Sequence, residues 1–343
     1  MNNEDEIVQD VLLKTQNGGC AALIANTVDN AISLYEKIKQ SASPDTMVLL
    51  YHGRHTVEKK GEMTNKITKL FGIDRGHRPK KAIVVSTQIM EQSIDVDFDY
   101  LFSYLAPIDL LIQRLGRLWR HFDKGTIREY MKIDVPVTIY IPNDKEMQFE
   151  YNQRYGKSSF VYKHEEIMEK TLAELKNLPS STIMIPSDVP SLTNRVYSNN
   201  KMKNALDKMA EFKAFARTLE KPSDDTFTLY QNKEMIGTID IMTRESDLIT
   251  LSIALVEETM YNEIKQSNND NKQVDFNICK NVLLEKTVNI GVNKIKDFAN
   301  VEFEDGKGML IGTRIFKTNA NGVVESLNGK KMYIDDEMGL VIV

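Results

Sequence analysis

The sequence has little of what defines several specialised protein classes. Only two of its 343 residues are cysteines and only five are histidines. Cys20 and Cys279 lie far apart in apolar surroundings, so they form no metal-ligand spacing and are predicted to be buried free thiols. The histidines do not cluster with cysteines or carboxylates as zinc ligands would. No metal site is therefore expected.

Long hydrophobic runs and excess positive charge are also missing. No apolar run approaches the length that spans a bilayer, and the acidic start MNNEDEIVQD lacks the basic-then-apolar order of a signal peptide. These absences predict a cytoplasmic protein with no membrane partner. The net charge is −5, so any nucleic-acid contact must come from a local groove. The 41% hydrophobic and 27% charged residues describe a soluble globular chain, long enough for two domains.

The first part of the chain alternates short apolar runs with helical patterns. The runs are rich in β-branched residues and are bounded by polar residues or proline, which predicts five buried strands within residues 20–27, 46–52, 82–87, 100–107 and 135–142. Helical periodicity lies between them, at residues 28–40, 58–72 and 108–122. This alternation predicts an α/β domain with a parallel sheet, residues 20–26 and 82–87 being interior strands.

The pattern changes near residue 143. Residues 163–178 and 201–220 are predicted to form two long charged helices, separated by a loop over residues 179–195. Strand signals follow at residues 226–230, 234–242, 248–258 and 287–295, and residues 265–273 are predicted to be a polar surface loop. Asn-Gly turns at 321–322 and 328–329 suggest hairpins. We therefore predict an α/β domain over residues 1–142, a helical connector over 143–225 and a small β-rich (α+β) domain over 226–343.

The stretch QRLGRLWRH, residues 113–121, is the most specific motif. On a helix, Gln113, Arg117 and Arg120 would share one face, while an apolar seam would lie opposite, formed by Ile108, Leu111, Leu115, Leu118 and Phe122. Two arginines on adjacent turns repel each other unless an anion lies between them, and guanidinium groups suit phosphate oxygens. A solvated basic helix face is the simpler interpretation of an arginine pair. The full Gln-Arg-x-Gly-Arg-x-x-Arg pattern favours an anion site next to Gly116.

Polar residues also follow a predicted strand in the stretch VVSTQIMEQSIDVDFD, residues 84–99. Thr87 and Gln88 end the strand, where open α/β sheets place their ligands, and Asp95 follows in the next loop. The alternating carboxylates from Asp95 to Asp99 do not make a calcium loop. The sixth position is Tyr100 rather than glycine, and the twelfth is alanine rather than glutamate.

Residues 86–121 together resemble motifs V and VI of a superfamily 2 helicase. More narrowly, the Thr-Gln-x-x-Glu-x-Ser-x-Asp-x-Asp run before Gln-Arg-x-Gly-Arg resembles the signature helicase–nuclease of type I CRISPR systems. LIANTVDNAISLYEKI is similar to motif IV of that family, and LLYHGRHTVEKKGEMTNKITKLFG to its next block, although Lys59 and Lys60 stand where an Asp-Arg pair is usual. The resemblance is strong over residues 20–125. In the C-terminal part it is weaker and points to the type I-E branch.

The resemblance implies a RecA-like fold and a set of roles. ATP with magnesium would bind between two RecA-like domains, the first supplying the phosphate loop and the magnesium site, so this chain ligates no metal. Arg117 and Arg120 would act as arginine fingers, Gln113 would lie near the nucleotide, and Asp95 would couple nucleotide to DNA. The residues nearer single-stranded DNA would be Asn26, Thr27, His52, Arg54, Thr87 and Gln88. Implied partners are single-stranded DNA, the N-terminal helicase–nuclease half and the CRISPR surveillance complex Cascade.

The sequence contains no G-x-x-x-x-G-K-[ST] motif, no DExH box and no N-terminal histidine–aspartate nuclease pair. Its nearest decoy, YGKSS from Tyr155, has Tyr151 where the first glycine belongs. We therefore expect the second half of an ATP-dependent helicase, inactive alone. Two alternatives remain open: a non-catalytic module that binds DNA or docks on a surveillance complex, and a truncated gene remnant. A neighbouring reading frame with the missing motifs would favour the helicase half.

Overall fold

The computed structural model describes residues 3–91, 94–121, 136–141, 155–162, 165–197, 250–270 and 272–343. The chain divides into two compact units, each described here by itself. One comprises Leu105–Gly116 and Ile141–Glu245, together with Met1, and the other comprises Asn2–Tyr104, Arg117–Tyr140 and Ser246–Val343. Among the described residues, no helix has both the length and the apolar character to cross a membrane.

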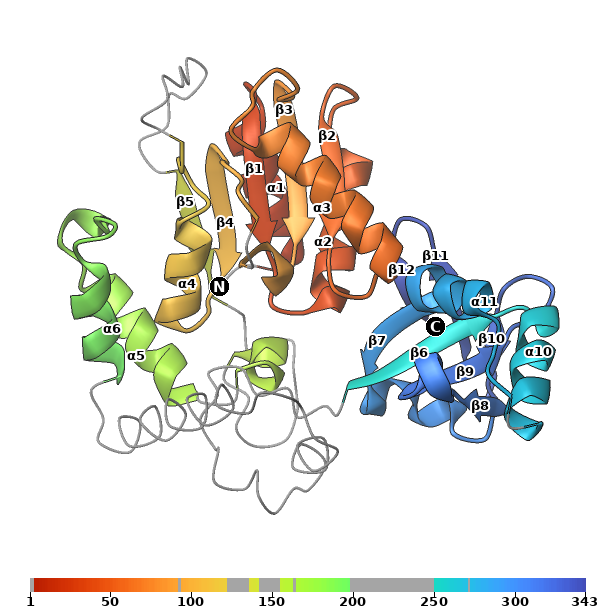
Figure 1. Ribbon diagram of the computed structural model, residues 1–343. Coiled ribbons are helices and arrows are strands. Elements are labelled where there is room, and N and C mark those ends of the chain that lie inside the picture. Colours follow the sequence, from red (N-terminus) through yellow and green to blue (C-terminus); the bar gives the residue numbers. More distant parts are fainter. Residues whose placement is uncertain are drawn as a thin grey trace. The chain divides into compact units, whose positions relative to one another are not determined.

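The larger unit contains the predicted parallel sheet. Its strands run in the order β2-β3-β1-β4-β5 and all neighbours are parallel (Figure 1). The bounds are β1 Gly19–Ile24, β2 Met47–Tyr51, β3 Lys81–Ser86, β4 Tyr100–Tyr104 and β5 Val137–Tyr140. Every residue of β1 is buried, as is nearly all of β3, because helices cover both faces of the sheet. The five predicted strands and the two interior positions are confirmed.

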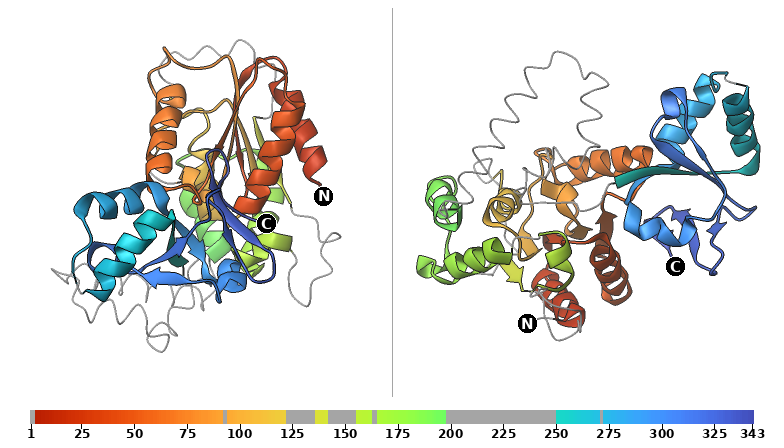
Figure 2. Two further views of the ribbon diagram at one scale, coloured as in Figure 1. Left: turned by 90° about the vertical axis from the view of Figure 1, so that its right-hand side faces the viewer. Right: turned by 90° about the horizontal axis from the view of Figure 1, so that it is seen from below.

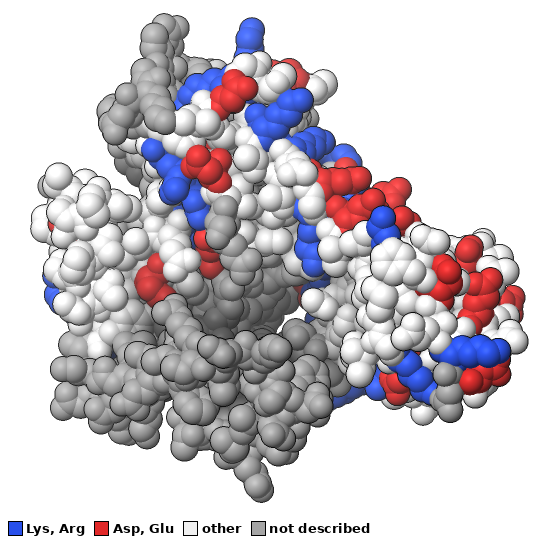
Figure 3. All heavy atoms as spheres, in the orientation of Figure 1, with Lys and Arg blue, Asp and Glu red and all other residues white. Residues whose placement is uncertain are grey.

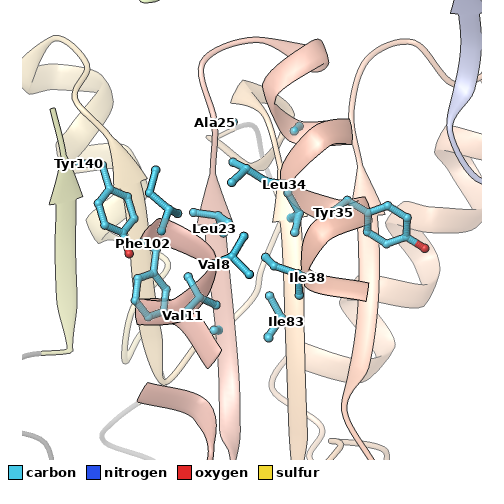
Figure 4. Close-up of a cluster of buried hydrophobic side chains, with 14 of the residues drawn as sticks. Val8, Val11, Leu23, Ala25, Leu34, Tyr35, Ile38, Ile83, Phe102 and Tyr140 are labelled. Carbon is cyan, nitrogen blue, oxygen red and sulfur yellow. The ribbon is translucent and has the colours of Figure 1, made fainter. Parts of the chain in front are cut away.

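Helices cover the sheet on its two faces. The views agree that α1 (Glu4–Thr15) and α2 (Val28–Ser41) lie on one face and α3 (Val57–Phe71) on the other (Figures 1 and 2). Thr27 and Thr56 cap α2 and α3 by accepting hydrogen bonds from backbone N–H groups in the first turn. Apolar side chains of α1 and α2 interlock with those of the strands, among them Val8, Val11, Leu23, Leu34, Ile38, Ile83 and Phe102 (Figure 4). Burying each such side chain contributes roughly 1.5–3 kcal/mol.

The smaller unit is helical where it is described. It contains α4 (Ile108–Leu115), α5 (Glu165–Lys176) and α6 (Val189–Tyr197), with short 3-10 turns at Gly156–Phe160 and Pro179–Ser181. The first predicted connector helix is confirmed as α5. The loop predicted over residues 179–195 is wrong only from Val189 onward, where α6 begins, because Leu192 and Val196 place one face of that helix in a core with Ile108 and Ile167. The second connector helix, at 201–220, and the predicted strands at 226–230 and 234–242 lie outside the described residues.

The C-terminal residues of the larger unit form two small sheets. A four-stranded sheet has the order β7-β6-β9-β8, and a three-stranded sheet has the order β10-β11-β12. The strands are β6 Thr250–Val256, β7 Thr287–Gly291, β8 Phe303–Asp305, β9 Thr313–Lys317, β10 Val324–Glu325, β11 Lys331–Asp335 and β12 Gly339–Ile342. The helices are α10 Glu258–Asn269 and α11 Phe276–Asn281, continued by a π-turn, Val282–Lys286. The short 3-10 segments are Val292–Phe298 and Gly308–Leu310.

Three predictions for this region are confirmed and one is wrong. The strand predictions at 248–258 and 287–295 correspond to β6 and β7, and the Asn328-Gly329 turn joins β10 to β11. The polar loop predicted over 265–273 is helical as far as Asn269. The helix continues because Ile264 and Asn268 face the β sheet, where Asn268 donates to Glu304 and to the carbonyl of Asp305.

Candidate nucleotide and DNA contact site

The backbone after α4 departs from the prediction. A helix over residues 108–122 was expected, but α4 ends at Leu115 with Gly116 as its C-cap. Leu118 instead forms a parallel bridge with Phe98, in which the Phe98 N–H donates to the Arg117 carbonyl (2.9 Å) and the Trp119 N–H to the Phe98 carbonyl (3.1 Å). These bonds replace the helical ones, so the shared helix face is not formed. Leu115 and Leu118 are half-buried rather than buried.

Trp119 marks this departure with a positive φ of 50°. That region is uncommon for any residue but glycine and is unfavourable for a bulky side chain. The surrounding contacts hold it there, since its backbone pairs with Phe98 and its indole Nε1–H donates to the Asp99 carbonyl (3.1 Å). The reversal of the chain at Trp119 turns Arg120 and His121 toward Asp95.

The two motif arginines have different environments. Arg117 is only 8% exposed, and its guanidinium donates to the carbonyl of Glu91 (3.0 Å). Arg120 is exposed, and its Nε donates to Asp95 Oδ1 at 2.7 Å. Burial, and next the charge of Arg120, lower the pKa of Arg117 below its ordinary value. Arg117 is thus a buried group with a backbone partner, whereas Arg120 lies at the surface against the Asp95 carboxylate. Gln113 is exposed on α4.

Asp95 is the acceptor on which this cluster converges. Its Oδ1 accepts a hydrogen bond from Arg120 Nε and lies 3.0 Å from Nε2 of the largely buried His121. Partial burial raises the pKa of Asp95, but the hydrogen bonds from Arg120 and His121 outweigh it and hold the pKa below its ordinary value. Asp95 is therefore ionised at neutral pH. An incoming anion near Arg120 would compete with this carboxylate for the guanidinium.

Asp97 and Asp99 are buried completely and anchor the same segment. Asp97 pairs with Arg75, and Asp99 Oδ2 lies 3.0 Å from Arg78 Nη2 and accepts the Cys20 N–H at 2.7 Å. Arg78 also donates to the Asp97 carbonyl (2.7 Å). Their alternation therefore serves internal ion pairs, which agrees with the exclusion of a calcium loop. Both cysteines are free and buried, as predicted.

The sequence interpretation assigned no role to Arg75, Arg78 or Arg114. The first two belong to the DRGHRP loop before β3, and the signal that points to them is the carboxylate alternation, since buried carboxylates need cationic partners. Arg114, the first arginine of the motif, is fully buried in the smaller unit and donates to the Tyr162 hydroxyl (3.0 Å). Nothing in its immediate sequence distinguishes it from Arg117.

The six predicted DNA-contact residues do gather at one edge of the sheet. They follow the carboxyl ends of three adjacent strands, with Asn26 and Thr27 after β1, His52 and Arg54 after β2, and Thr87 and Gln88 after β3. The Gln88 amide donates to the Asn26 carbonyl (2.6 Å), and the Thr87 N–H to the Tyr51 carbonyl (3.3 Å). The shared edge is the position expected for a ligand in an open α/β sheet.

Their exposure divides this group. Thr27, Arg54 and Gln88 are half-buried and reach solvent, whereas Asn26, His52 and Thr87 are buried. His52 is fully buried and stacks on His55. It offers no surface to DNA in this conformation, which the sequence did not predict. Arg54 pairs with Asp29 at 2.7 Å.

The charges on the described surface are mixed. Figure 3 shows lysines and arginines interspersed with aspartates and glutamates on the face in view, without an extended basic stripe there. This distribution agrees with the net charge of −5.

Comparison with known proteins identifies relatives of this architecture. Residues 17–123 match the family model described as CRISPR-associated nuclease/helicase Cas3, C-terminal. A Cas3 from Escherichia coli is 28% identical over 331 residues, covering 93% of this chain and 35% of the relative, and one from Streptococcus thermophilus is 30% identical over 200 residues, covering 57% and 20%. The crystal structure of T. fusca Cas3-AMPPNP superposes with a TM-score of 0.68 at 23% identity, covering 99% of this chain and 40% of that one. The chain thus spans well under half the length of these relatives.

Proposed function

We propose that this chain is one lobe of an ATP-dependent DNA helicase and corresponds to the C-terminal region of Cas3, which it resembles in sequence and fold. In this proposal it works in the cytoplasm in antiviral defence. It provides arginine fingers and single-strand contacts, and a separate N-terminal half supplies the phosphate loop, the magnesium site and the nuclease.

The observation that carries the proposal is the pairing of Phe98 with Leu118. This bridge joins the motif around Asp95 to the motif of Arg117 and Arg120, so that the two motifs form one local structure. Arg117 is fixed before any ligand arrives, which is what electrostatic stabilisation of a phosphoryl group requires. Arg120 is the adjustable partner, because a phosphate can replace Asp95 on its guanidinium while His121 stays on the carboxylate.

Asp95 then provides the coupling between the two ligands. Its segment begins just beyond the loop of Thr87 and Gln88 at the proposed DNA edge, and it ends at the buried pairs of Asp97 and Asp99. Transfer of Arg120 from Asp95 to a phosphate would leave Asp95 with His121 alone. That change in charge is the local event that would transmit nucleotide occupancy to the strand-contact edge.

The proposed DNA contact uses the half-buried residues of this edge, Thr27, Arg54 and Gln88. Hydroxyl, amide and guanidinium groups suit backbone phosphates rather than base edges, so binding is sequence-insensitive and salt-dependent. A chain at 22% identity with a TM-score of 0.64 belongs to the solved structure described as a CRISPR RNA-guided surveillance complex, pre-nicking. On that basis we extend the same class of partner to this chain.

Complementation tests the proposal. The chain and the N-terminal half of the motor from the same organism are produced separately and assayed for ATP hydrolysis, alone and mixed, with and without single-stranded DNA. We expect no turnover from this chain alone and DNA-stimulated turnover from the mixture. Turnover by this chain alone, or a mixture no more active than the N-terminal half, would reject the proposed division of labour.

A further inference from the structure

The β11–β12 hairpin at the C-terminus contacts the loop after β2, about 285 residues earlier in the sequence. The strands pair from Met332 with Ile342 to Asp335 with Gly339. The Asp335 carboxylate closes the turn by accepting the backbone N–H groups of Glu337 (2.8 Å) and Met338 (2.7 Å). Met332, near the open end of the hairpin, and Leu340, next to its turn, are both fully buried in the C-terminal core, so the hairpin packs against that core along its length.

The tightest contact is between backbones. The Leu340 N–H donates to the Arg54 carbonyl at 2.9 Å. Gly339 makes this approach possible, because a Cβ built at that position would lie 2.5 Å from the Arg54 carbonyl oxygen. Its φ of 68° also favours glycine. Both the space and the backbone conformation at residue 339 therefore depend on the absence of a side chain.

Charged side chains anchor the hairpin and its domain on α2. Glu337 accepts hydrogen bonds from the Tyr35 hydroxyl and from Lys39. Asp29 pairs with Arg54 at 2.7 Å and with Lys294, which follows β7, at 2.6 Å. Arg54 is consequently fixed at both ends, by the hairpin at its carbonyl and by Asp29 at its guanidinium.

The hairpin covers two stacked histidines. The rings of His52 and His55 are parallel, with centroids 4.2 Å apart, and both side chains are at most 1% exposed. His52 Nε2 and both ring nitrogens of His55 make no hydrogen bond of normal geometry. Burial lowers the pKa of His52 to about 2 and that of His55 to about 4, so both rings are neutral at physiological pH. The charged groups acting on them are Arg54, Lys59, Lys60 and Asp335.

We propose that the β11–β12 hairpin is a clasp that positions the His52–Thr56 loop, and with it Arg54, for contact with single-stranded DNA. This inference rests on the proposed DNA contact but has a consequence of its own. Without the clasp, the loop would lose its backbone bond to Leu340 and its cover over the histidines. Gly339 and Asp29 are then positioning residues, acting on DNA only through Arg54.

Two matched glycine variants of the 343-residue chain test the clasp. Gly339→Ala and Gly329→Ala both put a side chain at positive φ, but only the first collides with Arg54, since a Cβ at residue 329 would meet nothing within 4 Å. Hydrogen–deuterium exchange should accelerate in peptides covering residues 51–56 and 333–342 for Gly339→Ala and remain unchanged there for Gly329→Ala. Equal exchange in the two variants would overturn the clasp. The fluorescence of Trp119 checks that the parallel-sheet domain stays folded.

Titration with single-stranded oligonucleotide at several salt concentrations tests the positioning role. Gly339→Ala should weaken binding and reduce the salt slope by about 0.7, the contribution of one phosphate contact. Combining it with Arg54→Ala should add nothing further. Tighter binding by Gly339→Ala would mean that the hairpin blocks DNA, and would overturn the proposal. If exchange changes as expected while Arg54→Ala alone leaves DNA binding unaltered, the clasp stands and the DNA function assigned to this edge fails.

Discussion

Substitution of Asp99 by asparagine should destabilise the parallel-sheet domain through a single buried charge. Asp99 is fully buried, 3.0 Å from Arg78 Nη2, and accepts the Cys20 N–H at 2.7 Å. Asparagine keeps the size and an acceptor oxygen but leaves the guanidinium of Arg78, which is 9% exposed, without its ionic partner. Breaking a buried ion pair from one side costs about 3–5 kcal/mol. We expect about 3 kcal/mol, because Arg78 keeps its bond to the Asp97 carbonyl.

Urea unfolding followed by tryptophan fluorescence measures this cost locally. The chain has one tryptophan, and the indole of Trp119 donates to the Asp99 carbonyl, so the probe reports on this region. With a denaturant slope of about 2 kcal/mol per molar, the midpoint should fall by roughly 1.5 M. The control is Asp270→Asn, which breaks the exposed pair with Lys272 and should cost less than about 0.5 kcal/mol. Equal midpoints for the two variants would refute the assignment of Asp99 as an internal anchor.

Three further expectations concern the hairpin, the smaller unit and the DNA edge. Burial lowers the pKa of His52 to about 2 and of His55 to about 4, so the exposed rings would bind protons that the covered rings do not. Docking of the β11–β12 hairpin should therefore be complete above about pH 6.5 and weaken as the pH falls toward 4. The measurement is hydrogen exchange, corrected for intrinsic rates, which should become faster at low pH. Exchange that does not depend on pH would argue against the burial of His52 and His55 under the hairpin. Leu192→Ala should lower the free energy of unfolding by about 3 kcal/mol, measured by urea unfolding with the helical circular-dichroism signal. The control Leu327→Ala changes a side chain that is 84% exposed and should lower it by less than about 0.5 kcal/mol, so similar losses in the two variants would contradict the packing of α6. Arg54→Ala should weaken single-strand binding at low salt and little at high salt, so that identical titrations with wild type would remove Arg54 from the DNA path.

Local sequence patterns predicted the parallel sheet because its strands are continuous apolar runs. An apolar run such as residues 20–24 fits only a strand that is buried on both faces of a sheet. Thr27 and Thr56 are N-cap residues and therefore mark where α2 and α3 begin. The same local approach placed the end of α4 too late. The periodicity of residues 108–122 is helical, but the backbone of Phe98 forms hydrogen bonds with the Arg117 carbonyl and the Trp119 N–H. Pairing with Phe98, about 20 residues earlier in the sequence, replaces the helical hydrogen bonds there, and no pattern within residues 108–122 predicts it.

The candidate site was predictable as a set of residues but not as an arrangement. Strand ends identify Thr87 and Arg54 as edge residues, since parallel strands carry their carboxyl ends to one side. The His52–Thr56 loop contacts Gly339 and Leu340, which lie far away in the sequence. The ion pairs of Asp29 with Arg54 and Lys294 also join segments that are far apart in the sequence, so no local periodicity predicts them.

The central claim is that Arg120 acts on the nucleotide rather than on the fold, and Arg120→Lys tests it most directly. Lysine keeps the charge at an exposed position but cannot reproduce the guanidinium fork. In the complemented mixture we predict that kcat for ATP hydrolysis falls by about 10³-fold or more, as for other arginine fingers, while the Trp119 unfolding midpoint stays within error. Arg195→Lys, in an exposed pair with Glu174, should leave kcat unchanged. A kcat within threefold of wild type for Arg120→Lys would contradict the account.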